Sequence, residues 1–351
     1  VDGTETHHGL ADWGEYATFL SELQSGTADP TPEIEAIVKE VLADVPPDPY
    51  EKAARLYGWV QENVRYVSIQ VGLGGWRPYP ASEVMKNRFG DCKDKATLLK
   101  SMLAVAGIES RLASLYSHGG VPHEFVLPNL GFTNHAILAI ELPDRRVIVD
   151  PTERTVPFGA LPFRDQEAPL LLVGSKDEPI VRTPATGPDV NVRTTHLTLA
   201  PKEAGNWSGQ ASVHAQGSIA SGLHDRLLGK GSNLGGHITS YANIVESDSS
   251  APAWSVDDDG AVTASVDVDF RQVGSKVGDR WMLRASDVLG ARWSDLERGK
   301  RKTPVLLEIR RTLTEVVEFQ LAGGSAHRLP EPVEARSQQV FYRLAWAATD
   351  S

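Results

Sequence analysis

The chain contains one cysteine, Cys92, at a position where a thiol could act as a nucleophile. A free thiol is mostly protonated at neutral pH, because its pKa is about 8.5, so a nucleophilic cysteine needs help from its surroundings. A helix N-terminus gives such help, since its unpaired N–H groups favour negative charge. The residues Gly90-Asp91 end a loop directly before Cys92, and apolar residues then recur at helical spacing. The sequence therefore predicts that Cys92 opens a helix whose first turn favours a thiolate.

A cysteine nucleophile also needs a base, and His135 is the candidate. It directly precedes a predicted strand over residues 136–142, and Asp150 ends the next predicted strand, which covers residues 145–149. The Pro143-Asp144 step between the two strands predicts a turn, so they should form a hairpin. The far ends of a hairpin lie side by side, which places His135 beside Asp150. A nucleophile, a base and an acidic residue that orients the base are the parts of a catalytic triad.

The elements that must position these residues are helices first and strands afterwards. Apolar residues at helical spacing predict helices within residues 10–65, a short helix over 81–86, and a helix from Cys92 that Gly107 closes. Strand-forming residues predict extended chain over 65–71 and a strand over 111–116.

The second half of the chain has a different texture and is predicted to be mostly β. Strand-like runs separated by Gly- and Asp-rich turns predict antiparallel pairing, interrupted by a helical insertion at 219–228 and 238–244. A length of 351 residues suits two domains. The predicted strands cover residues 192–199, 211–215, 262–270, 305–313 and 316–319.

The composition excludes several classes of function. The formal net charge of −11 argues against nucleic acid or an anionic membrane as the main partner, because both need a basic surface. No run of about 18 apolar residues predicts a membrane span. A single cysteine excludes intramolecular disulfides and a thiolate-rich zinc cage. The sequence starts at Val1 with no visible signal peptide, so we expect a trimmed or processed product.

Three segments together resemble the transglutaminase-like, papain-related superfamily: residues 90–96 (Gly-Asp-Cys-Lys-Asp-Lys-Ala), residues 134–136 (Asn-His-Ala) and residues 149–152 (Val-Asp-Pro-Thr). The resemblance implies the order Cys, His, Asp, with the cysteine opening a helix and the other two on neighbouring strands. The Cys-Lys-Asp-Lys signature is similar to a bacterial branch that also carries the domain of unknown function 3857. Unlike that branch, this chain lacks the preceding β domain and is expected to begin at its trailing edge.

The resemblance implies an α+β fold in three parts. We expect a helical lead-in over residues 1–49, a transglutaminase-like (papain-like) catalytic core over 50–185 and a β-rich antiparallel domain over 190–351. An oxyanion hole should use the backbone N–H of Cys92 and a side-chain donor upstream of it. Gln70 is the favoured donor, and Trp76 is the alternative, although Trp76 also fits an aromatic lid over the loop.

The implied function is cysteine-dependent acyl transfer on amide bonds through a thioester, more as a peptidase or amidase than as an amine cross-linking enzyme. The substrate would be a peptide or protein, no metal or cofactor is expected, and the implied location is periplasmic or exported. The rival hypothesis is a binding or scaffold module that works through the β-rich domain. A thiol redox sensor is a third hypothesis, which would need a partner cysteine from another chain. The spacing of His118 and His123 matches no strong zinc pattern and favours a solvated loop.

Overall fold

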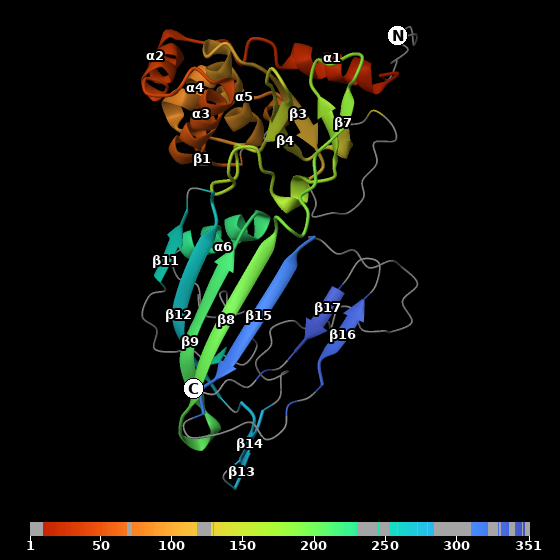
Figure 1. Ribbon diagram of the computed structural model, residues 1–351. Coiled ribbons are helices and arrows are strands. Elements are labelled where there is room, and N and C mark those ends of the chain that lie inside the picture. The colour runs from red at the N-terminus through yellow and green to blue at the C-terminus, as the bar shows by residue number, and fades with distance from the viewer. Residues whose placement is uncertain are drawn as a thin grey trace.

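The computed structural model has the predicted α+β architecture (Figure 1). Helices α1 to α5 and a five-stranded sheet form one part, and a long six-stranded sheet with helix α6 forms the other. The structure describes residues 10–68, 72–117, 128, 130–229, 244–245, 253–257, 259–271, 273–278, 280–283, 310–321, 329, 331–336, 341–345 and 347.

The helical part consists of α1 (Trp13–Leu23), α2 (Pro32–Val41), α3 (Pro49–Asn63), α4 (Ala81–Asn87) and α5 (Cys92–Val105). Proline at the first position opens α2 and α3, where its missing N–H costs nothing. The apolar faces of all five helices meet in one core, so the lead-in helices α1 and α2 share that core with α5. The predicted bounds of the three parts stay a prediction.

The first sheet has the strand order β5-β4-β3-β6-β7, and every pairing in it is antiparallel. Helix α5 packs on β3 and β4, and the other face buries a second apolar cluster that includes Leu161. The predicted hairpin is confirmed, since Leu138 of β4 pairs with Val149 of β5. The strands are β3 (Glu109–Leu115), β4 (His135–Glu141), β5 (Arg146–Val149), β6 (Pro169–Leu172) and β7 (Ile180–Arg182).

Two short parallel strands fix the chain directly before α5. Strand β1 (Arg65–Tyr66) pairs with β2 (Phe89–Gly90), so Tyr66 lies opposite Gly90. The predicted extended segment is therefore paired only over its first two residues, and residues 69–71 lie outside the described part. The 3-10 helix η1 (Gly72–Gly75) follows.

The second sheet has the order β10-β12-β9-β8-β15, with β11 also paired to β12. Its core strands alternate buried and exposed residues, as a half-buried sheet requires. The buried face carries Trp207, whose ring N–H donates to the Val273 carbonyl (2.9 Å). Its strands are β8 (Val192–Pro201), β9 (Trp207–Ala215), β10 (Ile244–Val245), β11 (Ala253–Val256), β12 (Val262–Phe270) and β15 (Thr312–Phe319).

One strand departs from the predicted pattern, because β15 runs parallel to β8. The long stretch of chain between β12 and β15 supplies the crossover that a parallel pair needs. The structure also has one strand where two were predicted, since Thr314 and Glu315 continue the ladder; residues 305–309 lie outside the described part. The remaining strands form two hairpins: β13 (Ser275–Val277) with β14 (Arg280–Met282), and β16 (Val333–Arg336) with β17 (Phe341–Leu344).

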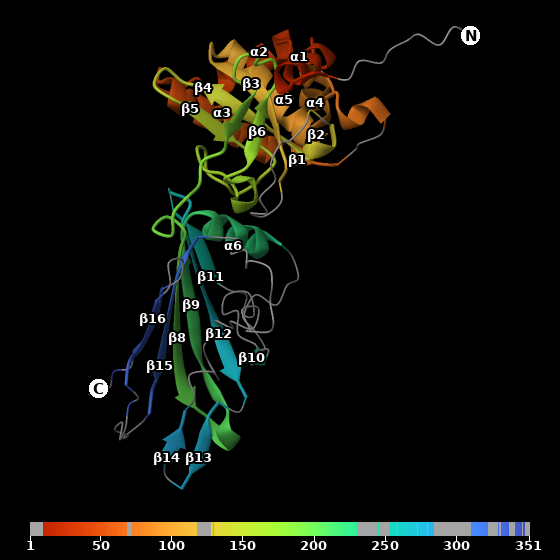
Figure 2. The same cartoon turned by 90° about the vertical axis from the view of Figure 1, so that its right-hand side faces the viewer.

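The first segment of the predicted helical insertion is confirmed as α6 (Ser218–Leu228). In the second segment, residues 238–243 lie outside the described part, and the prediction is wrong for Ile244, which pairs with β12 as part of β10. Figure 2 shows α6 across the end of the long sheet that faces the helical part. Its N-terminal turn contacts the segment that follows β5, because Thr155 donates to the Ser221 carbonyl (3.1 Å) and Gln166 donates to the Ser218 hydroxyl (3.1 Å). The β-rich part is thus attached to the segment that carries η3 (Phe163–Asp165).

Candidate active site

Cys92 is the first residue of α5, as the sequence predicts. Asp91 caps the helix, since its side chain accepts from the Asp94 N–H (3.4 Å), and the Asp94 carboxylate accepts from the Asp91 N–H (3.0 Å). This reciprocal capping box fixes the first turn. The Cys92 side chain is therefore held at the positive end of the helix macrodipole, with 5% of the residue exposed.

The charged residues that follow Cys92 are buried and anchor the loop before it. Lys93 pairs with the Asp91 carboxylate, and Asp94 accepts from the Tyr79 N–H (2.9 Å). The Lys95 ammonium donates to the Val64 carbonyl (2.7 Å). Burial lowers the pKa of Lys95 to about 8, against the opposing charges of Asp150 and Glu153. The Lys-Asp-Lys run therefore acts structurally, by holding the chain on both sides of the thiol.

Gly90 offers a test of this packing. A Cβ on Gly90 would lie 2.6 Å from the Asp94 Cβ, so Gly90→Ala should push the capping box apart. We expect the free energy of unfolding to fall by about 1–3 kcal/mol, as in other overpacked sites, measured by urea denaturation. The matched control is Gly58→Ala in α3, where a Cβ meets nothing within 4 Å and alanine should not destabilise. Equal stability of the two variants would contradict the packing argument.

His135 opens β4 and lies across the sheet from Leu115. Its Nε2 is 2.9 Å from Asp150 Oδ2, and Cys92 is close enough to the ring to raise its pKa. Burial alone would lower the pKa of His135. The charge and hydrogen bond of Asp150, together with Cys92 and the charge of Asp165, hold this pKa well above its ordinary value.

Asp150 follows the last residue of β5 and is fully buried. Its Oδ1 accepts from the Thr152 N–H (2.9 Å) and hydroxyl (2.7 Å), while its Oδ2 faces His135. Burial would raise the pKa of Asp150, but the charge and hydrogen bond of His135 and the two Thr152 bonds lower it to about 2. The Tyr57 hydroxyl lies 3.0 Å from the Asp150 carbonyl oxygen and holds the backbone in place. The structure thus brings together Cys92, His135 and Asp150, as the sequence predicts.

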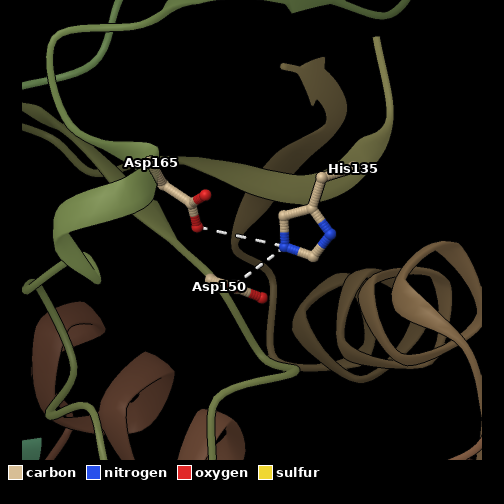
Figure 3. Close-up of side chains that lie close together, drawn as sticks. All are labelled: His135, Asp150 and Asp165. Atoms are coloured by element: carbon tan, nitrogen blue, oxygen red, sulfur yellow. Dashed lines mark hydrogen bonds and ion pairs between the residues drawn. The ribbon is translucent and has the colours of Figure 1, made fainter. Parts of the chain in front are cut away.

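A second carboxylate, which sequence reasoning missed, lies on the same ring nitrogen. Figure 3 shows the His135 ring with one nitrogen directed at both Asp150 and Asp165. The Oδ2 of Asp165 is 3.9 Å from Nε2, and its Oδ1 accepts from the Ser117 hydroxyl (2.5 Å). Asp165 comes from the 3-10 helix η3. A single acidic residue in such a short segment has no spacing pattern from which its place in the site could be predicted.

A pocket of about 320 Å³ opens beside His135. Burial, and then the neighbouring Cys92 and Asp91, raise the pKa of Tyr66, whose ring lines this pocket. An ion pair between Arg164 and Glu153 lies on the wall, and the Arg164 side chain is 39% exposed. The pocket is lined by Tyr66, Ser117, Asn134, His135, Thr152, Glu153 and Arg164.

The donor atoms of His135, Asp150 and Asp165 lie within 4.8 Å of one another, a spacing that also suits a cation. Cationic groups already occupy the surroundings, however, because Arg164 Nη2 is 3.8 Å from Asp150 Oδ2. Asp150 also accepts hydrogen bonds from Thr152, and its Oδ2 faces the ring nitrogen of His135. The oxygens of Asp150 therefore already face an arginine, a threonine and a ring nitrogen.

The structure describes only one of the two predicted side-chain oxyanion donors, Trp76. Gln70 lies outside the described residues, as do His118 and His123. Trp76 lies in the turn after η1, half-buried, where its carbonyl accepts from the Gln24 side chain (3.5 Å), and it is not among the residues that line the pocket. That position fits an aromatic lid over the loop better than direct contact with the reacting carbonyl. The roles of Gln70 and Trp76 as oxyanion donors both stay predictions.

Comparison with known proteins confirms the resemblance for the site-bearing segment. Residues 36–151, about one third of the chain, match the transglutaminase-like superfamily. This range contains Cys92, His135 and Asp150 and ends before Asp165. No curated protein matches the sequence. Among the residues that the structure describes, no helix combines the length and apolar character needed to cross a bilayer.

Two solved structures are similar to the chain. One is a proposed protease from Parabacteroides distasonis ATCC 8503, with 10% sequence identity and a TM-score of 0.44, covering 80% of this chain and 55% of that one. The other is a proposed cysteine protease from Cytophaga hutchinsonii, with 19% identity and a TM-score of 0.28, covering 36% of this chain and 40% of that one. The chain thus spans about half the length of the structures it matches.

Proposed function

We propose that the segment matching the transglutaminase-like superfamily is the catalytic centre of a cysteine-dependent enzyme that hydrolyses amide bonds in peptides or proteins. The observation that carries the proposal is that Cys92 lies close enough to the His135 ring to raise its pKa, while the Nε2 of the same ring lies 2.9 Å from the buried Asp150 carboxylate. A histidine whose cationic form is stabilised by a buried carboxylate suits a thiolate–imidazolium pair. The location of Cys92 at a helix N-terminus supports the same pair.

The reaction would have two halves. His135 takes the thiol proton, and the Cys92 sulfur attacks the amide carbonyl carbon to give a tetrahedral oxyanion, with the Cys92 N–H as one donor to that oxygen. The C–N bond then breaks as His135 gives its proton to the leaving nitrogen, and a thioester forms. In the second half, His135 takes a proton from water, the hydroxide oxygen attacks the thioester, and the C–S bond breaks to release a carboxylic acid and the thiol.

We favour water over an amine as the acceptor. An amine acceptor needs a binding site of its own beside the thioester, whereas water needs none. The pocket beside His135 is polar, with Ser117, Asn134 and Thr152 on its wall, which suits a hydrated peptide segment. A periplasmic or exported location accompanies this proposal through the family resemblance.

The experiment that tests the proposal uses the whole chain with a mixture of peptides in ¹⁸O-labelled water, with and without a primary amine probe. Mass spectrometry should detect new peptide ends that carry one ¹⁸O atom, and these ends should be absent with Cys92→Ala. Incorporation of the amine in place of ¹⁸O would make the enzyme a cross-linking one. Identical peptide mixtures with the parent and the variant would contradict the proposal and favour the binding-module hypothesis.

A further inference from the structure

Asp165 reaches the site from a different element than the other three residues. It ends η3, in the segment between β5 and β6, whereas His135 and Asp150 belong to the β4–β5 hairpin. Its Oδ2 nevertheless lies 3.9 Å from the same Nε2 that Asp150 contacts at 2.9 Å. One nitrogen of the His135 ring therefore faces two carboxylates, while the other ring nitrogen is directed away from them (Figure 3).

The surroundings of Asp165 are costly for a carboxylate. The residue is fully buried, Ser117 satisfies Oδ1, and Oδ2 has no hydrogen-bond partner among the described residues. A buried carboxylate oxygen without a donor is unfavourable unless a cation lies nearby. The cation toward which Oδ2 is directed is the imidazolium form of His135.

The other charges around His135 do not replace this contact. Arg164 Nη2 is 3.8 Å from Asp150 Oδ2 and also pairs with Glu153, so the charge of Asp150 is shared between two cations. Lys95, on α5, is directed at the Val64 carbonyl. Tyr66, from β1, and the Cys92 thiol are further titratable groups near the ring among the described residues. Two cations, Arg164 and His135, thus face two carboxylates, Asp150 and Asp165.

We propose that Asp165 is a positioning residue for the reaction, which acts through His135 by stabilising its imidazolium form and fixing the ring between two carboxylates. The proposal rests on the proposed function of His135 as the base. It extends the site beyond the segment that matches the superfamily, since Asp165 lies after residue 151. It also gives the β-rich part a task, because the Gln166 side chain next to Asp165 is held by Ser218 of α6.

The titration of Asp165 supports this role. Burial raises its pKa to about 7, with His135 opposing and Asp150 adding to the shift. Asp165 would therefore become negatively charged as the pH rises through neutrality, and its carboxylate would then stabilise the protonated ring of His135 more strongly. A carboxyl whose folded pKa is raised destabilises the fold above that pKa, and the penalty disappears as the pH falls toward the unfolded value of about 3.9.

The test measures the His135 ring directly and needs no turnover. NMR titration of ¹⁵N-histidine protein, with the His135 signal assigned from its loss in His135→Gln, should give a His135 pKa lower by about one unit or more in Asp165→Asn. Asp269→Asn is the matched control, because it removes the same charge from an exposed site on β12. A change in Asp165→Asn no larger than in the control would overturn the proposal, whether or not the protein hydrolyses amides.

Two further measurements keep the proposal testable if Asp165→Asn folds poorly. In the parent, the ¹³C carboxyl signal of Asp165 and the ring signal of His135 should each show an inflection at the pH where the other group titrates, because the two groups interact; titrations of the two groups that are independent of each other would overturn the proposal. Where activity is measured, the basic limb of the kcat/KM profile should move to lower pH in Asp165→Asn. A loss of kcat with an unmoved limb would mean a structural role only.

Discussion

Cys92→Ala is expected to remove amide hydrolysis, with kcat falling by about six orders of magnitude as in other enzymes that lose their nucleophile. Alanine keeps the helix start, because the capping box uses Asp91 and Asp94 and not the thiol. The loss of activity should therefore come without a loss of structure. Continuous assays on a substrate found with the parent, with circular dichroism as the check on folding, measure both quantities.

The alternative outcome is equally informative. Activity of Cys92→Ala within about tenfold of the parent would mean that another group carries the reaction, since the chain has no second thiol. A folded variant with full binding of partner proteins and no change in function would favour the scaffold hypothesis.

Asp150→Asn is expected to lower kcat by about four orders of magnitude, as when the orienting acid of a triad becomes an amide. The asparagine oxygen can still accept from Thr152, which leaves the amide N–H₂ to donate to His135 Nε2. The ring proton would then reside on Nδ1, which is the nitrogen that has to accept the thiol proton. The variant should fold, and its rate should recover little at any pH, which a pH profile checks.

Asp150→Asn should also change how the free energy of unfolding depends on pH. The pKa of Asp150 is lowered to about 2, so its charge stabilises the fold fully above the unfolded value of about 3.9, and this contribution is lost as the pH falls toward 2. Between about pH 4 and pH 2, the free energy of unfolding of Asp150→Asn should therefore fall less steeply than that of the parent. A variant that keeps near-parent activity and an unchanged acid transition would contradict the role given to Asp150.

Much of the site was predictable because it depends on local rules. Gly90-Asp91 before an apolar helical pattern predicted the start of α5, and the Pro143-Asp144 turn predicted the hairpin that joins His135 to Asp150. Capping and two-strand pairing involve neighbours in sequence, so a pattern reading captures them.

The parts that escaped prediction depend on tertiary contacts. Asp165 approaches His135 from an irregular segment held by Ser117 and α6, and no periodicity encodes that approach. The parallel pairing of β15 was missed because strand direction depends on the course of a long connection and not on the composition of the strand. The packing of α1 and α2 into the core around α5 likewise follows from shared apolar faces that the sequence shows only one helix at a time.

The most direct test of the account is the rate of Cys92 alkylation by iodoacetamide from about pH 4 to pH 9, a range that brackets the free-thiol value, in the parent and in His135→Ala. We predict that the parent reacts rapidly well below the pH at which an ordinary thiol ionises, and that His135→Ala loses this reactivity at low pH. Profiles that coincide with each other and with a denatured thiol would contradict the thiolate–imidazolium pair, and with it the proposed enzyme.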